Sequence, residues 1–84
     1  MADLYWSKGA PGLYYLWNGP RTDRTRTFYG KVHRQKDGRY RAQFQQGELK
    51  IDLLERTAPH TIIANTEFAI RKARPGTWFH KEGF

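Results

Sequence analysis

Side chains that can take part in chemistry recur at alternate positions between residues 29 and 45. In the two strands expected within this stretch, the polar face would carry Tyr29, Lys31, His33, Arg39, Arg41, Gln43 and Gln45. Alternate residues of a strand point to the same face of a sheet, so a hairpin here would gather these side chains on one surface. Arg and Lys can pair with a guanine edge and Gln with an adenine edge, while a tyrosine can stack on an unpaired base. The pattern indicates contact with nucleic acid, and the alternative is a solvated face with weak cross-strand pairs.

Positive charge is concentrated around this stretch. The chain of 84 residues has a net charge of +7, and the segment between Arg21 and Arg41 holds eight Lys or Arg against two Asp. Arg21, Arg24 and Arg26 belong to residues 20–27, a polar segment that we expect to be a loop. Its arginines are suited to holding a nucleic-acid backbone or entering a minor groove. Such a concentration favours a polyanionic partner over a surface charged only for solubility.

Several other classes of function lack support in the sequence. The chain has no Cys, which excludes disulfides and Cys-based zinc sites and fits a reducing cytoplasm. We expect a soluble intracellular protein without membrane contact, because no apolar run approaches the roughly 18 residues of a spanning helix and the N-terminus does not resemble a signal peptide. His60 and His80 have no metal-ligand spacing, and no phosphate-cradling or nucleophile motif is present. No metal or other cofactor is therefore expected.

Two hairpins are predicted that agree on the same two faces. A three-residue loop, residues 36–38, with glycine in the left-handed position sorts apolar from polar side chains, whereas a two-residue loop at Asp37-Gly38 would mix them. The preferred register pairs Gly30 with Phe44, Val32 with Ala42, Arg34 with Tyr40, His33 with Arg41, Lys31 with Gln43 and Tyr29 with Gln45. A tight turn at Gln46-Gly47 would then pair Phe44 with Leu49, Ala42 with Ile51, Tyr40 with Leu53, Gln45 with Glu48, Gln43 with Lys50 and Arg41 with Asp52. The predicted apolar face consists of Phe28, Val32, Tyr40, Ala42, Phe44, Leu49, Ile51 and Leu53.

That apolar face needs a cover, and residues 57–76 can supply it. Thr57 with Pro59 can open a helix, and Arg74-Pro75-Gly76 can close it. One face of such a helix would consist of Ile62, Ile63, Thr66, Ala69, Ile70 and Ala73. The alternative is a strand over residues 60–64 followed by a shorter helix that begins near Asn65 or Thr66.

The remaining segments complete a single domain over residues 1–84. Residues 1–12 are expected to be an arm, and "GLYYLWNGP" a short aromatic strand closed by a turn. Tyr14, Tyr15 and Trp17 are expected in the core, with a base-stacking platform as the alternative. Residues 77–84 are expected to be a tail that tucks Trp78 and Phe79 against the core. The predicted fold is α+β, an antiparallel β-meander of three to four strands packed on one C-terminal helix.

The basic strands that end in "DGRYRAQF", followed by a further strand and a helix, resemble a known DNA-binding module. It is the three-stranded-sheet-plus-helix module at the N-terminus of tyrosine recombinases (integrases) and in plant AP2 transcription factors. The resemblance covers about residues 27–74, rests on "GRYRAQF" and on topology, and lacks the aromatic-then-acidic helix start of that family. It implies a sheet laid in the major groove, with Lys31, His33, Arg39, Arg41 and Gln43 facing the bases. Small phage-encoded proteins are also similar, and many of those bind host proteins.

We therefore expect a small accessory or regulatory protein that binds nucleic acid, with duplex DNA favoured over RNA. One alternative is an inhibitor or modulator whose basic face docks on an acidic surface of a host nucleic-acid enzyme. The other is a metal-free, toxin-like RNase in which His33 moves the proton and Arg41 or Lys31 stabilises the phosphorane, beside Tyr29. A histidine in a basic hairpin is more often a phosphate contact, so binding is expected rather than catalysis.

Overall fold

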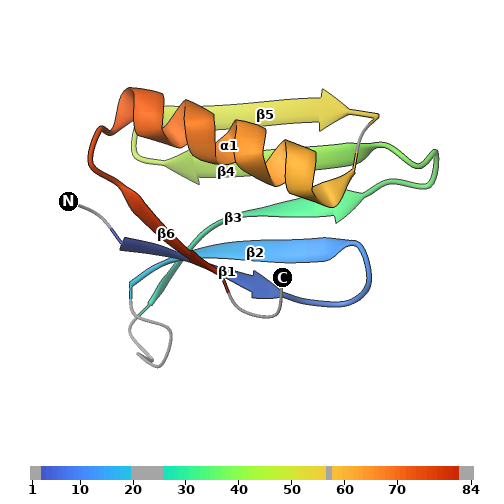
Figure 1. Cartoon of the computed structure of the whole chain (residues 1–84), viewed down its shortest axis with the longest axis horizontal. Coiled ribbons are helices and arrows are strands. Elements are labelled where there is room, and N and C mark those ends of the chain that lie inside the picture. The colour runs from blue at the N-terminus through green and yellow to red at the C-terminus, as the bar shows by residue number, and fades with distance from the viewer. Residues whose placement is uncertain (1–2, 20–25, 57, 82–84) are drawn as a thin grey trace.

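The computed structural model describes residues 3–19, 26–56 and 58–81, and it is an α+β fold of one six-stranded sheet and one helix (Figure 1). The elements in chain order are β1 (Asp3–Lys8), β2 (Leu13–Asn18), β3 (Thr27–Arg34), β4 (Tyr40–Gln46), β5 (Leu49–Glu55), α1 (Pro59–Ala73) and β6 (Trp78–Lys81). The strands lie in the order β5-β4-β3-β2-β1-β6. Neighbours are antiparallel except β1 and β6, which are parallel, and α1 connects β5 to β6.

The predicted register of the hairpin formed by β3 and β4 is confirmed. Gly30 pairs with Phe44, Val32 with Ala42 and His33 with Arg41. The amide of Gln35 donates to the carbonyl of Arg39 at 2.7 Å, which closes a loop over residues 36–38. Gly38 has a φ of 85°, the left-handed conformation that this loop requires. The period-two pattern and the glycine position thus sufficed to define this hairpin.

The predicted register of β4 and β5 is wrong by two residues. Phe44 pairs with Ile51 rather than with Leu49, and Ala42 pairs with Leu53. The turn consists of Gly47 and Glu48, and Gly47, with a φ of 60°, is its first residue rather than its second. Glycine at the first central position is the mark of a type II′ turn, whose twist matches that of the strands. Because a strand repeats every two residues, the slip leaves the apolar and polar faces unchanged.

A β-bulge in β3 exchanges the predicted places of two aromatic residues. Leu16 pairs with Gly30, but Trp17 pairs with Phe28, so Tyr29 is an extra residue without an opposite partner in β2. Tyr29 belongs to the buried core and is 2% exposed, whereas Phe28 is 50% exposed. The expectations that Phe28 lies in the core and that Tyr29 lies on the polar face are therefore both wrong.

The long helix is confirmed over Pro59–Ala73, without a strand at residues 60–64. Pro59 occupies the first turn, where its missing N–H is not needed, and Pro75 disfavours helical geometry at Arg74. The buried residues of the helix are Ile62, Ile63, Thr66, Glu67 and Ile70. Figure 1 shows α1 lying along β4 and β5, which it contacts on one side of the sheet. We call this covered side the inner face and the opposite side the outer face.

The sheet is larger than predicted because both ends of the chain add strands. Residues 3–8, expected to be part of an arm, form β1, which pairs with β2, and Trp6 is completely buried. Residues 78–81, expected to be part of a tail, form the edge strand β6. Phe79 packs against the core as predicted, but Trp78 is 58% exposed. Trp17 and Tyr15 also differ from expectation, since they lie on the outer face beside Phe28.

A buried carboxylate links the helix to the added strands. The indole Nε1 of Trp6 donates to Oε2 of Glu67 at 3.2 Å, and Nζ of Lys81 lies 3.1 Å from Oε1 of the same side chain. Glu67 is 6% exposed, so its charge depends on these two partners for compensation. This contact ties β1 and β6 to α1.

Candidate nucleic-acid interface

The outer face over β3, β4 and β5 is formed by side chains that alternate with the core residues. Paired residues point to the same side, so Lys31, Gln43 and Asp52 form one row across the three strands, and Gln45 and Lys50 form the next. His33, Arg41 and Leu54 make a third row. All of them except the half-buried His33 and Arg41 are exposed. This half of the outer face is polar except for Leu54, and it has an excess of cations.

An aromatic cluster borders that polar surface on the side of β2. Its members are Tyr15, Trp17 and Phe28, with ring centroids 5.6 to 6.1 Å apart. The indole Nε1 of Trp17 donates to Oγ of Ser7 at 2.8 Å, which fixes the ring on the sheet. The guanidinium carbon of Arg26 lies 4.0 Å from the centroid of the Trp17 ring, a cation–π contact. Tyr15 pairs directly with Lys31, so aromatic and cationic side chains adjoin.

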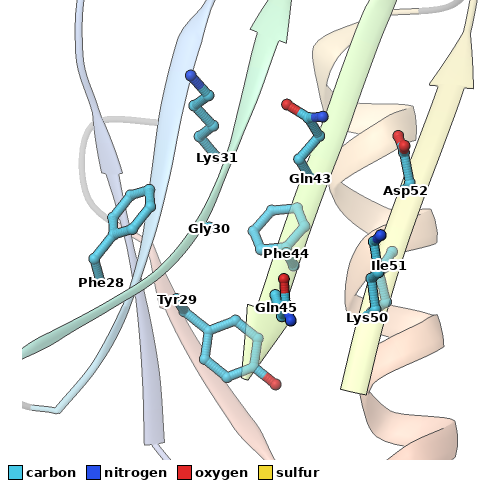
Figure 2. Close-up of a pocket in the computed structure, with 10 residues that line it drawn as sticks. All are labelled: Phe28, Tyr29, Gly30, Lys31, Gln43, Phe44, Gln45, Lys50, Ile51 and Asp52. Atoms are coloured by element: carbon cyan, nitrogen blue, oxygen red, sulfur yellow. The ribbon is translucent and has the colours of Figure 1, made fainter. Parts of the chain in front are cut away.

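The bulge leaves a hollow between the aromatic cluster and the polar rows. Tyr29 and Gly30 are both turned away from the outer face, so β3 presents no side chain there between Phe28 and Lys31. A pocket of about 300 Å³ occupies this place and is lined by Phe28, Lys31, Gln43, Gln45, Lys50 and Asp52, among others. Figure 2 shows Phe28 on one side of Gly30 and the two glutamines on the other. The hollow therefore joins an exposed ring, two amides and two lysines.

Besides Arg41, which is described below, three of the predicted contact residues of β3 and β4 lie on the outer face as expected. Lys31 and Gln43 are exposed neighbours, and His33 stands beside Arg41 one row further along. Lys31 makes no ion pair within residues 3–19, 26–56 and 58–81. Arg26 also reaches this face, through its contact with Trp17. These four side chains can meet a partner together.

The two arginines of β4 and its preceding loop are held by carboxylates. Arg41 donates through Nε and Nη2 to both oxygens of Asp52, at 3.1 and 2.9 Å. The hydrogen bonds and charge of Arg41 hold the pKa of Asp52 below its usual value, and Asp52 raises the pKa of Arg41 in turn. Arg39 pairs with Asp37 at 2.6 Å and lowers the pKa of that carboxyl, mainly through hydrogen bonds. Each arginine therefore brings its own counter-charge, and neither is a free cation of the kind that the sequence pattern indicated.

Tyr29 is removed from the interface by the bulge. Its ring packs against Phe44, with centroids 6.3 Å apart, in the buried core. Its hydroxyl finds no hydrogen-bond partner among the described residues. Burial raises the pKa of this phenol, and the charge of Arg74 lowers it by a smaller amount. Tyr29 still lines the pocket on the outer face, but with 2% of its surface exposed it offers little to a base or a phosphate.

The arrangement considered for RNA cleavage is incomplete, since it required Tyr29 beside His33, Lys31 and Arg41. Tyr29 lies in the core, and Arg41 is engaged by Asp52.

Arg21 and Arg24, predicted to contact a nucleic-acid backbone, lie outside the described residues. In the described part of the chain, no group of three His, Asp or Glu could hold a metal ion. No helix among these residues is long and apolar enough to cross a membrane.

The sequence reasoning missed Phe28, Lys50 and the hollow. The signal that could have found them is Gly30, because a glycine inside a strand pattern often marks a bulge or a close backbone approach. A Cβ at residue 30 would collide with the ring of Phe44 and the carbonyl oxygen of Gln43. A bulge before Gly30 reverses the facing of the residues that precede it, and this places Phe28 outside.

Comparison with known protein families, with curated proteins and with solved structures finds no match to this chain.

Proposed function

We propose that this protein binds nucleic acid through the outer face of its sheet, in an accessory or regulatory role. The observation that supports this best is the meeting of the aromatic cluster with unpaired cationic side chains on one exposed surface. Lys31 pairs with Tyr15 across β2 and β3, and Arg26 stacks on Trp17. Sequence-tolerant nucleic-acid binding has two components, aromatic rings that stack on the bases and a positively charged surface that follows the backbone.

The net charge of the chain also favours binding to nucleic acid. The net charge of +7 raises the local concentration of any polyanion and speeds its encounter with the protein. On β3, β4 and β5, the outer face carries Lys31, Arg41 and Lys50 against the single carboxylate of Asp52. The pairing of Arg41 with Asp52 reduces this excess, so Lys31 and Lys50 are the side chains on which phosphate contact chiefly depends.

The dependence of binding on salt tests the proposal. Fluorescence anisotropy of a labelled oligonucleotide would be followed as the salt concentration rises from about 50 to about 200 mM, where each lost phosphate contact changes the slope of log K against log salt by about 0.7 to 0.9. Lys31→Gln should lower the slope by about this amount for one contact. Lys72→Gln is the matched control, since Lys72 is exposed on α1, which covers the inner face.

Two results would contradict the proposal. One is an absence of binding to any nucleic acid at low salt, which would favour the alternative of a protein partner with an acidic surface. The other is an equal loss of slope in Lys31→Gln and Lys72→Gln, which would mean that the outer face is not the surface in contact.

A further inference from the structure

We infer that the hollow on the outer face receives one unpaired base of a single-stranded nucleic acid, while a neighbouring base stacks on the aromatic cluster. This inference rests on the proposed function and specifies its ligand. It differs from the expectation of duplex DNA that the sequence pattern favoured.

The bulge makes the hollow a place from which one ring is missing. In an uninterrupted strand, Tyr29 would stand on the outer face beside Gln45, in the row that continues to Lys50. Tyr29 instead joins the core, and Gly30 adds no side chain. The resulting volume of about 300 Å³ lies at the lower end of the roughly 300–1,000 Å³ typical of small-ligand pockets. A nucleic-acid base is a flat heterocycle, and its shape resembles that of the aromatic side chain missing from this place.

The walls of the hollow match the surfaces of a nucleotide. Phe28 is 50% exposed and can stack on the face of a base. Gln43 and Gln45 are exposed amides, each with donors and an acceptor for a base edge. Lys31 and Lys50 stand at the border of the same hollow and can meet the phosphates on either side of the base (Figure 2).

The geometry favours a single strand over a duplex. Six strands about 4.8 Å apart make a sheet roughly 24 Å wide, twice the major-groove width of about 12 Å, so the outer face cannot lie flat in the groove. The faces of duplex bases are already stacked on each other, so neither the cluster nor the hollow could reach them. Unpaired bases offer both a face and an edge, which sheet surfaces with exposed aromatic residues use in recognising single strands.

The experiment compares four ligands of about 12 nucleotides, within the roughly 4–16 nucleotides that one single-strand-binding OB fold covers. They are oligothymidylate, oligouridylate, an abasic DNA strand with the same phosphates, and a DNA duplex. Their dissociation constants would be measured by anisotropy with the wild type, with Phe28→Ala and with Phe68→Ala. Phe68 is 69% exposed on α1, so its removal deletes an equal ring from the opposite side of the molecule.

The inference predicts that the wild type binds at least one of the two single strands ten-fold or more tightly than it binds the abasic strand and the duplex. Phe28→Ala should weaken that binding by about 5-fold to 150-fold, the range for one stacked base, and leave the abasic strand unaffected. Phe68→Ala should change nothing. The stronger of the two single strands identifies the ligand as DNA or RNA.

The failures of the two proposals are distinguishable. Equal binding of the abasic strand and the base-bearing strands would overturn the inference but keep phosphate contact. Equal or tighter binding of the duplex, or an unchanged affinity in a folded Phe28→Ala, would do the same. If none of the four ligands binds at low salt, the proposed function itself is wrong.

Discussion

Arg41 and Asp52 form a two-hydrogen-bond ion pair on the outer face, although they are not opposite each other in the sheet. Arg41 is paired with Leu54, and Asp52 is paired with Gln43, so the side chains meet diagonally between β4 and β5. Diagonal neighbours lie within reach of long side chains such as arginine. The pair restrains Arg41, the one Lys or Arg within β4, and it therefore limits the positive charge available to a ligand.

Asp52→Asn is expected to tighten binding to nucleic acid. The substitution removes a negative charge from the border of the hollow and frees the guanidinium of Arg41 for a phosphate. The slope of log K against log salt should grow by about 0.7 to 0.9 for one added contact. Glu48→Gln, in the turn between β4 and β5, makes the same change in net charge without freeing an arginine. An equal gain in both variants would show that only overall charge matters.

The ion pairs of Asp52 and Asp37 should resist acid down to low pH. Arginine partners lower the pKa of both carboxyls below 3.8, so the folded form binds these protons less readily than the unfolded chain does. Their contribution to stability is therefore complete above pH 3.8 and is lost as the pH falls through the lower folded values. The fall in melting temperature between about pH 5 and about pH 2.5 should be smaller in Asp52→Asn than in the wild type. A larger fall in the variant would contradict this account.

Tyr29→Phe should stabilise the protein or leave it unchanged. The tyrosine hydroxyl is buried without a partner among the described residues, and such a group costs about 1–3 kcal/mol of desolvation. We expect a gain of about 1 kcal/mol in the free energy of unfolding, or about 4–8 °C in melting temperature. A loss of more than about 1 kcal/mol would mean that the hydroxyl has an unrecognised partner.

Alkaline pH provides a second measurement on the same pair of proteins. Burial raises the pKa of Tyr29 above 10.0. The contribution of this raised pKa to the free energy of unfolding is complete below pH 10.0 and is lost as the pH rises through the higher folded value. Thermal melts of the wild type should therefore deteriorate more between about pH 10 and about pH 11.5 than those of Tyr29→Phe. Parallel curves would refute the assignment of this loss to Tyr29.

Gly30→Ala should destabilise the fold, because a methyl group there would collide with the ring of Phe44 and with the carbonyl oxygen of Gln43. One of the two obstacles is backbone, which cannot turn away as a flexible side chain can. Overpacking of this kind costs about 1–3 kcal/mol, which chemical denaturation would measure. Gly38→Ala is a useful comparison, since its cost arises from its φ of 85° and not from a collision. Equal stability of Gly30→Ala and wild type would argue against the close approach of β3 and β4.

The sequence predicted best those features that depend on local periodicity. The register of β3 and β4 followed from alternation and from one glycine, and α1 followed from Pro59 and Arg74-Pro75 at its two ends. The strand β6 and its partner β1 are far apart in the chain. Their parallel pairing depends on the path of α1 across the sheet, which no short window of sequence contains.

The candidate site was predicted in part for a related reason. The residues beyond Gly30, such as Lys31 and Gln43, follow the regular alternation, and their facing was foreseen. The facing of Phe28 and Tyr29 depends on a bulge opposite Leu16 and Trp17, a property of two strands rather than of one. The sequence also predicts that Arg41 pairs with Asp52, as opposite residues rather than diagonal ones, whereas the pairing of Arg39 with Asp37 depends on the geometry of the loop.

A single-stranded nucleic acid should bind the outer face of the sheet and not the helix. Amide chemical-shift mapping by NMR during titration with the tighter-binding single strand distinguishes the two surfaces. We expect shifts concentrated at Trp17, Phe28, Lys31, Gln43 and Lys50, with little change along Pro59–Ala73. Shifts centred on α1, or none at a concentration of strand that saturates binding, would refute binding at the outer face.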